Sequence, residues 1–430
     1  MALLWFLPST RAAATPAPLA EAAAAARPDS SLRVSIITCW PGSEIYELYG
    51  HSAIRVQAAG GVDSVWNYGL FDFNRPHFVY RFVKGETDYM VGGCPFTFFI
   101  PEYLQTGRRV VEQVLNLTPQ EASAMRAMLR RESLPDMRTY RYNYVRDNCA
   151  TRIIDRLEEA THVRPIFSDS LTYGTYRSEM RAYNRNYPWY QFGIDLVLGS
   201  GLDHELTGRD EMFVPLEMMQ RMQTARFSDG RPMVKEEHVI VEGRGPQQLP
   251  PTPWHRGPMA VALLVLAVSV AVAVAEWWRR RIVKWWNSLF FCLTGLAGCL
   301  VCFLVFFSSH EATSPNMLAI WLNPLQLIAG ACLWRRATQP LARAVAFYNI
   351  AVIAVLLAVW PMQRQSADPA VFPWMASALI LSATYAIIAY KESYNRNEPI
   401  SDIGADKSRR VSNRASGKPR KAAPRGRNRR

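Results

Sequence analysis

Residues 258–275 have the sequence PMAVALLVLAVSVAVAVA, which contains no Asp, Glu, Lys or Arg. A helix needs about 20 apolar residues to cross the hydrocarbon core of a bilayer. Further charge-free apolar stretches of similar length follow at 288–307, 317–333, 344–360 and 371–390. Five such stretches separated by short polar loops are not typical of the buried core of a soluble protein. The sequence therefore predicts an all-α transmembrane domain of five helices over residues 258–391.

Lys and Arg in the connecting loops predict the orientation of this domain. Loops 276–286 and 334–343 and the segment 391–430 together hold 20 of these residues. The alternate loops, 308–316 and 361–370, hold one. Cytoplasmic loops carry the excess of Lys and Arg, so the first set is expected in the cytoplasm. With five spans, the C-terminus is then cytoplasmic and everything before residue 258 is exported.

The net charge of +13 lies mostly in the tail of the chain. Residues 407–430 hold 11 Lys and Arg and no acid, which leaves +2 for the other 406 residues. Residues 31–257 hold 26 basic and 27 acidic side chains, so this region does not have the charge of a nucleic-acid-binding domain. We expect 392–430 to be a disordered, basic, cytoplasmic tail that is attracted to an anionic membrane surface.

The N-terminal part is expected to contain a targeting segment and one exported domain. A short apolar run at 2–8 is followed by Ala-rich sequence, which resembles the end of a signal peptide, although the charged region that normally precedes it is missing. We therefore assign 1–30 to targeting and linker sequence and 31–245 to the exported domain. Residues 246–257, rich in Pro and Gly, form the linker to the first span.

Local patterns predict an α+β fold for the exported domain. The capping box Thr118–Glu121, with Pro119 between, predicts a helix over 119–132, and Asn148 is expected to cap a helix over 149–159. We expect a small antiparallel sheet with the helices on one side. The predicted strands, rich in β-branched and aromatic residues, are 32–39, 51–57, 62–70, 109–117 and 139–146.

Three of the seven cysteines, Cys39, Cys94 and Cys149, lie in the exported domain. In an oxidising compartment an odd number leaves at least one thiol free. Cys39 and Cys94 could form a disulfide or be separate buried residues. Cys149 directly follows Asn148 at a helix start, where free N–H groups and the helix dipole lower a thiol pKa and can stabilise an oxyanion. The alternative is that Cys149 is a small residue packed at a helix end.

His51 is the candidate general base for Cys149. It begins a predicted strand, and a Cys–His pair needs the imidazole within hydrogen-bond reach of the sulfur. A third polar group should fix the imidazole tautomer. The neighbouring strand offers Asn67 and Asp63, of which we favour Asn67. The sequence contains no metal-ligand spacing, so neither a metal nor a cofactor is expected.

Three motifs carry a resemblance to known families. A His strand that precedes an Asn-Cys helix start resembles the circularly permuted papain-like enzymes, including the lecithin–retinol acyltransferase group. Together with the C-terminal membrane domain, the motifs resemble the Lnb family of bacterial lipoprotein N-acyltransferases, and residues 310–316 and 323–325 resemble that domain's outer loop and next span. The motifs are Tyr49-Gly50-His51-Ser52-Ala53-Ile54-Arg55, Asn67-Tyr68-Gly69-Leu70-Phe71-Asp72-Phe73 and Arg146-Asp147-Asn148-Cys149.

The Lnb resemblance implies a fold, a location and a reaction. The exported domain would be a permuted papain-like domain in the periplasm, anchored in the bacterial inner membrane. Cys149, His51 and Asn67 would be catalytic. The acyl donor would be a phospholipid and the acceptor a diacylated lipoprotein, with a thioester on Cys149 between the two steps. Candidate substrate-binding residues are Tyr49, Arg55, Asn148, His310 and Asn316, of which the last two could instead cap helices.

Two other functions use the same residues differently. A membrane-anchored cysteine peptidase or amidase of the cell envelope would release its product to water. A non-catalytic envelope receptor or assembly module would keep Cys149 as a packing residue. A further open question concerns an aromatic cluster that could line an acyl groove or, more commonly, belong to a core. Its members are Phe71, Phe73, Phe78, Tyr80, Phe82, Tyr89, Phe96, Phe98 and Phe99.

Overall fold

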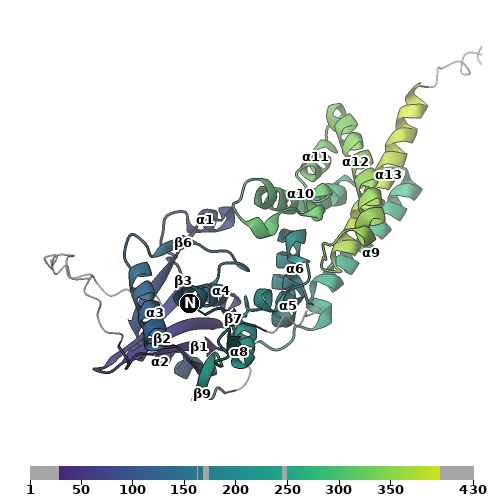
Figure 1. Cartoon of the computed structure of the whole chain (residues 1–430). Coiled ribbons are helices and arrows are strands. Elements are labelled where there is room, and N and C mark those ends of the chain that lie inside the picture. The colour runs from purple at the N-terminus through teal and green to yellow at the C-terminus, as the bar shows by residue number, and fades with distance from the viewer. Residues whose placement is uncertain (1–28, 162, 168–173, 245–248, 398–430) are drawn as a thin grey trace, which may run out of the picture. The chain divides into compact units, whose positions relative to one another are not determined.

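The structure is a computed structural model that describes residues 29–161, 163–167, 174–244 and 249–397 (Figure 1). The expected targeting segment and most of the basic tail lie outside these ranges. The chain forms two compact units. We call the first the sheet unit; it comprises Met1–Phe82, Glu86–Tyr176 and Glu205–Leu249. The second, the helical unit, comprises Val83–Gly85, Arg177–His204 and Pro250–Arg430.

The sheet unit is built on a seven-stranded antiparallel sheet with the order β6-β4-β3-β2-β1-β5-β9. All five predicted strands occur, the last of them shortened, and the sequence missed two, β4 and β9. β9 is mostly exposed, which explains why it lacks a hydrophobic signal. The strands are β1 (Arg33–Cys39), β2 (His51–Ala58), β3 (Val62–Leu70), β4 (Asp88–Pro95), β5 (Val110–Leu115), β6 (Thr139–Arg141) and β9 (Val234–Val241).

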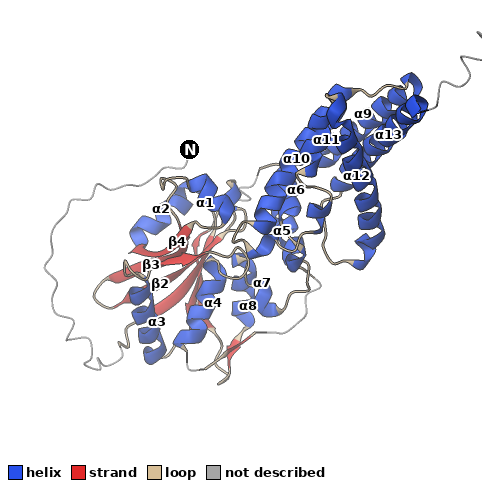
Figure 2. Cartoon of the chain, turned by 90° about the horizontal axis from the view of Figure 1, so that it is seen from above, coloured by secondary structure: helices blue, strands red, loops and turns tan. Residues whose placement is uncertain are grey.

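Helices cover both faces of the sheet, so the prediction that they lie on one side is wrong. One face packs on α3 (Pro119–Glu132), α4 (Cys149–Ala160) and α8 (Pro215–Thr224), and the other packs on α2 (Phe96–Thr106). Figure 2 shows the sheet between α2 and the pair α3 and α4. The cause is visible in β1, where Val34–Cys39 are all buried, because a strand covered on both faces needs apolar or satisfied side chains at every position.

The helical unit contains four helices that are long and apolar enough to cross a membrane. They begin with α9 (Pro258–Arg279) and α10 (Lys284–Phe306) and continue with α12 (Gln339–Val359) and α13 (Val371–Asn397). These four correspond to four of the five predicted spans.

The remaining predicted span, 317–333, is not one helix. It consists of η6 (Met317–Ile320) and α11 (Leu325–Cys332), separated at Asn323 and Pro324. Proline has no backbone N–H to continue a helix, and the Asn323 side chain accepts a hydrogen bond from the Leu325 N–H at 3.0 Å, which starts a new one. The prediction of five continuous helices is therefore not confirmed.

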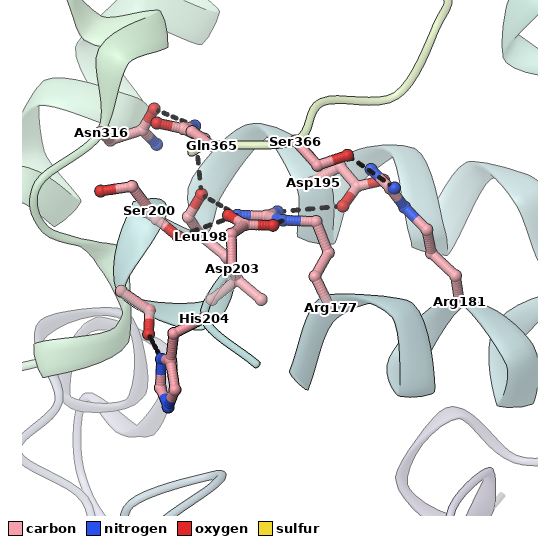
Figure 3. A network of polar contacts seen from close by, with 12 residues as sticks. Arg177, Arg181, Asp195, Leu198, Ser200, Asp203, His204, Asn316, Gln365 and Ser366 are labelled. Carbon is pink, nitrogen blue, oxygen red and sulfur yellow. Dashed lines mark hydrogen bonds and ion pairs between the residues drawn. The ribbon is translucent and has the colours of Figure 1, made fainter. Parts of the chain in front are cut away.

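Residues 177–204 group with the membrane helices, which the sequence did not predict. They contain most of α5 (Tyr176–Asn184) and all of α6 (Pro188–Val197). Arg177 is fully buried and contacts Asp195 at 3.0 Å and Asp203 at 2.8 Å. Figure 3 shows this network, which extends through Arg181 to Ser366 and through Leu198 to Gln365. It fixes the segment to the loop that precedes α13.

Candidate active site

Asn148 holds Cys149 at the first position of α4. Its side-chain oxygen accepts hydrogen bonds from the N–H groups of Ala150 at 2.8 Å and Thr151 at 3.0 Å, as an N-cap does. Its amide nitrogen donates to the carbonyls of Tyr144 at 3.0 Å and Phe213 at 2.9 Å. The predicted cap is confirmed. Because Asn148 is buried and fully hydrogen-bonded, its side chain serves to position Cys149, which remains partly exposed.

His51 and Asn67 meet across neighbouring strands. Ala53 pairs with Asn67 in the register of β2 and β3, so Asn67 is diagonal to His51 on the same face of the sheet. His51 Nε2 lies 3.0 Å from Asn67 Oδ1. An amide oxygen can only accept, so Nε2 carries the hydrogen of the neutral ring and Nδ1 is left free to take a proton.

Glycine is required immediately before His51. Gly50 has a φ of +78°, and a side chain there would place its Cβ 2.5 Å from the carbonyl oxygen of Cys39. Residues with a Cβ rarely adopt this φ, and the space is absent as well. The close turn lets β2 begin at His51 and sets the imidazole at the end of the sheet.

The thiol of Cys149 and the imidazole of His51 are hydrogen-bonded and shift each other's proton affinity. Burial is the largest effect and acts to raise the pKa of Cys149, but the hydrogen bond and charge of His51, together with backbone hydrogen bonds, outweigh it and hold that pKa below its ordinary value. Burial acts to lower the pKa of His51, but the bonds to Cys149 and Asn67 raise it. The N–H of Ser52 also bonds to the sulfur. Each side chain therefore stabilises the charged form of the other, the thiolate of Cys149 and the imidazolium of His51.

Tyr142 is a site residue that the sequence analysis missed. A tight turn, closed by two backbone bonds between Asn143 and Asp147, brings Tyr142 back to the start of α4. Its phenol bonds to the backbone of Cys149, and burial with the charge on Cys149 raises the pKa of Tyr142 well above its usual value. The phenol therefore stays neutral. The sequence did contain a signal for Tyr142, because tyrosine recurs at every second position, 140, 142 and 144, just before Asn148 and Cys149.

The other two cysteines of the sheet unit have different surroundings. Cys39 and Cys94 are both free thiols, so the disulfide alternative does not apply to this structure. Burial raises the pKa of Cys39 to about 12, and burial also raises that of Cys94. Of these three thiols only Cys149 has a lowered pKa. Within the described residues, no group of three or more His, Cys, Asp or Glu side chains could hold a metal ion.

The structure does not bring Arg55 to Cys149. Arg55 lies four residues after His51 on β2, a distance of roughly 13 Å along a strand. Its guanidinium contacts Asp63 at 2.7 Å and Glu112 at 3.2 Å, so Asp63, the alternative to Asn67, is engaged elsewhere. Tyr49 packs edge-on against Tyr144 with ring centroids 5.5 Å apart, close to the Asn148 cap. Substrate binding by Arg55 and Tyr49 stays a prediction.

His310 and Asn316 lie in the helical unit. The Asn316 side chain donates to the carbonyl of Leu196 at 2.9 Å and accepts from the Leu318 N–H at 3.0 Å, which makes it the cap of η6. It also accepts from Gln365 at 2.9 Å (Figure 3). All of these are structural contacts. His310 precedes the short helix η5 (Glu311–Thr313), and its carbonyl accepts from the Thr313 hydroxyl at 2.8 Å. Lipid binding by either residue stays a prediction.

Comparison with known families gives two matches. Residues 20–181 match the model of the Lnb N-terminal periplasmic domain, and residues 251–393 match the model of the Lnb transmembrane domain. Cys149, His51 and Asn67 lie within the first match. No curated protein and no solved structure matches the chain.

Proposed function

The chain belongs to the Lnb family of lipoprotein N-acyltransferases, and we propose that it moves an acyl chain from a phospholipid to the N-terminal amine of a diacylglyceryl lipoprotein. Its periplasmic domain and apolar helices make it an inner-membrane protein. The observation that carries the proposed mechanism is the hydrogen-bonded pair of Cys149 and His51, with the thiol pKa lowered and the imidazole pKa raised.

In the first step, His51 takes the proton of the Cys149 thiol and the thiolate attacks the ester carbonyl of the phospholipid. The N–H groups at the start of α4 stabilise the oxyanion of the tetrahedral intermediate. The intermediate collapses when the ester C–O bond breaks and the His51 imidazolium gives its proton to the leaving alkoxide. The products are a lysophospholipid and an acyl thioester on Cys149.

In the second step, the α-amine of the lipoprotein attacks the thioester carbonyl. His51 accepts a proton from the attacking amine, the C–S bond breaks, and the thiolate and imidazolium form again. An amide is gained and a thioester is lost, so the reaction needs neither an external oxidant nor an external reductant. Asn67 holds the imidazole in one orientation through both steps.

For the membrane domain we propose that 317–333 crosses the bilayer as a broken helix, which places the C-terminus in the cytoplasm. Non-helical backbone is tolerated at membrane depth where protein surrounds it. Leu318, Trp321 and Leu322, which lie on and just after η6, are fully buried, and the Gln326 side chain bonds to the carbonyl of Trp321 at 2.8 Å. The 20 basic residues in loops 276–286 and 334–343 and the segment 391–430 favour the same orientation.

Reporter fusions after residues 312, 338 and 397 test this orientation. A periplasm-dependent reporter should be active only at 312, and a cytoplasm-dependent reporter only at 338 and 397. Activity of the periplasmic reporter at 338 and 397 as well as at 312 would show that 317–333 does not cross.

The decisive experiment on the reaction is to weigh the protein after incubation with a phospholipid. We expect the full chain to gain the mass of one acyl group less one hydrogen, at Cys149, and to lose it on addition of hydroxylamine or of a diacylglyceryl peptide. Cys149→Ala should gain nothing, whereas Cys94→Ala, which removes a partly exposed thiol of the same unit, should behave as the unaltered protein.

Two outcomes would replace the proposal. Cleavage of cell-wall peptide by the purified protein, with lipoprotein N-termini unchanged in cells that lack it, would indicate the peptidase or amidase. Full function of Cys149→Ala and His51→Ala in cells would indicate the non-catalytic module.

A further inference from the structure

A row of aromatic side chains leads away from the start of α4. Tyr142 stacks on Tyr89 with ring centroids 4.5 Å apart, and Tyr89 lies 5.2 Å from Phe71. Phe71 stacks on Phe78 at 5.8 Å, and Phe78 stacks on Phe82 at 5.9 Å. Phe73 lies beside the row, 4.6 Å from Phe71. We call these six residues the aromatic strip; all lie in the sheet unit.

The inner end of the strip is at the candidate nucleophile. The Tyr142 phenol bonds to the backbone of Cys149. The ring of Tyr142 lies against Gly69, which has a φ of +89°, and a Cβ on Gly69 would be 3.3 Å from Tyr142 Cε2. The glycine therefore leaves room for the ring next to Cys149.

The outer end of the strip is exposed. Phe73 is 49% exposed and Phe82 is 46% exposed. Phe78 and Phe82 belong to the short helix α1 (Phe78–Lys84), which has no buried residue, and Val79 and Tyr80 on the same helix are more exposed still. Of the nine residues of the predicted aromatic cluster only Phe99 is fully buried. Every member of the strip is partly or largely exposed, so a core role does not explain the strip.

The helix α1 ends in the part of the chain that belongs to the helical unit. There the Lys84 carbonyl accepts a hydrogen bond from the Ser309 N–H at 2.8 Å, three residues after the end of α10. Gly85, with a φ of +77°, lies so close to His310 that a Cβ would be 3.2 Å from its backbone nitrogen. Lys84 and Gly85 therefore lie at the end of α10, one of the helices long and apolar enough to cross a membrane.

The composition of α1 fits a membrane interface. Exposed aromatic and aliphatic side chains alternate with Arg81 and Lys84, and such a mixture is typical of segments that lie in a membrane interface. Arg81 also forms an ion pair with Asp88 at 3.0 Å, which fixes the helix on β4. A contiguous exposed apolar surface of this kind normally has an occupant.

We propose that the aromatic strip binds one acyl chain of a membrane phospholipid, which enters at α1 and presents its ester to Cys149. This inference rests on the proposed acyltransferase function and identifies the donor site of that reaction. An acyl chain spans half the hydrocarbon core of a bilayer, about 15 Å. The four ring-to-ring steps from Tyr142 to Phe82, each 4.5 to 5.9 Å, follow a path that is longer than this and can accommodate a whole acyl chain. A cell-wall peptide would need polar partners that six aromatic rings do not offer.

Chain-length preference tests the strip. The full chain in detergent would be given phospholipids with 8, 12 or 16 carbons per acyl chain, and the rate of thioester formation on Cys149 would be measured. Phe71→Trp should narrow the middle of the track, so we expect the 16-carbon rate to fall at least tenfold and the 8-carbon rate to stay within twofold. Equal losses with all three donors would overturn the proposal.

The entry at α1 is tested in vesicles of phosphatidylethanolamine and phosphatidylglycerol. Phe73→Ser and Phe82→Ser should each raise the KM for vesicle lipid several-fold and leave kcat within twofold. Phe98→Ser is the matched control, because Phe98 is 76% exposed on α2 and lies outside the strip, and it should change neither constant. An equal rise in KM for Phe98→Ser, or no rise for either strip variant, would count against the entry.

A last measurement separates this proposal from the proposed reaction. A phospholipid with a diazirine near the end of one acyl chain would be photolysed with Cys149→Ala, which cannot form a thioester. Crosslinks within residues 71–89 support the strip even if no acyl transfer is found. Crosslinks confined to the membrane-spanning helices overturn it even if Cys149 proves to be acylated.

Discussion

The pair of Cys149 and His51 in the sheet unit and the cluster around Arg177 in the helical unit are both polar assemblies at protected positions, but they are satisfied to different degrees. Arg177 donates to two carboxylates and to the carbonyls of Leu198 and Gly199, all within 3.0 Å (Figure 3). Its charges are permanent and fully paired.

Cys149 and His51 have fewer partners, and their charges arise only when a proton moves from sulfur to nitrogen. Saturation of hydrogen bonds therefore distinguishes a structural cluster from a reactive one. A saturated cluster resists change at every atom, whereas the thiolate retains lone pairs that can attack a carbonyl.

Removing the nucleophile should have the largest effect on activity and almost none on stability. We expect Cys149→Ala to lower acyl transfer by a factor on the order of 10⁴ or more, as loss of a covalent nucleophile does. The melting temperature should remain close to that of the unaltered protein, since one partly exposed thiol is lost. Radioactive acyl transfer to a lipopeptide and thermal denaturation in detergent measure the two quantities. A steep fall in the melting temperature of Cys149→Ala would show that Cys149 is a packing residue.

Removing the centre of the saturated cluster should do the reverse. Arg177→Ala leaves the carboxylate of Asp203 buried without its cation and leaves Asp195 with Arg181 alone, which costs about 3–5 kcal/mol of stability. We expect a lower melting temperature and less protein in the membrane. The fraction that remains folded should still form the thioester. Arg185→Ala, at an exposed position on the same segment, is the control and should leave the melting temperature unchanged.

Asn67 lies between these extremes because it holds the base rather than reacting. Asn67→Ala removes the acceptor of the His51 Nε2 hydrogen, which costs about 1–3 kcal/mol and therefore about fivefold to 150-fold in rate. Asn67→Asp keeps an acceptor and adds a negative charge, so activity should largely return. Its pH profile should extend to higher pH, because the carboxylate raises the pKa of His51 further. Identical pH profiles for Asn67→Asp and the unaltered protein would exclude this role.

The smallest expected effect is a shift of the pH at which Cys149 reacts with iodoacetamide. Because the folded-state pKa of Cys149 is lowered, its thiolate persists below the pH at which an ordinary thiol is protonated, and it is lost as the pH falls through the folded pKa. Because the pKa of His51 is raised, its imidazolium persists to higher pH than that of an ordinary histidine, and its charge is lost as the pH rises through the folded-state pKa. Activity that needs both the Cys149 thiolate and the His51 imidazolium should therefore fall at low pH, where the thiolate is protonated, and at high pH, where the imidazolium loses its proton.

The controls for this measurement lie in the same protein. In His51→Ala the largest effects that oppose burial are absent, so the alkylation midpoint of Cys149 should move to higher pH. Cys94, whose pKa is raised by burial, should be alkylated only at higher pH than Cys149. A midpoint for Cys149 that does not change in His51→Ala would show that the pair is not coupled.

Features determined by neighbouring residues were predictable from the sequence. The Thr118 capping box and the Asn148 cap occur as expected, because a cap is decided within four residues. Four spans follow from continuous apolar runs. The break in the remaining predicted span, 317–333, was signalled by Asn323 and Pro324, since proline inside an apparent helix usually ends it.

Features that depend on distant contacts were not predictable. Arg55 belongs to a conspicuous motif next to His51, yet the positions of Asp63 and Glu112 direct it to an ion-pair network. The pairing of β5 with β9 joins residues more than 100 positions apart. The grouping of 177–204 with the membrane helices depends on Asn316 and Gln365, which no local pattern connects to Leu196 or Leu198.

The bond from Asn148 to the Phe213 carbonyl has a consequence for the order of events during synthesis. The two residues are 65 positions apart, so the cap that holds Cys149 is incomplete when Cys149 first leaves the export channel. The chain must first extend through 177–204 and return to the sheet unit. The thiol therefore becomes fully positioned late, after most of the periplasmic part has been delivered.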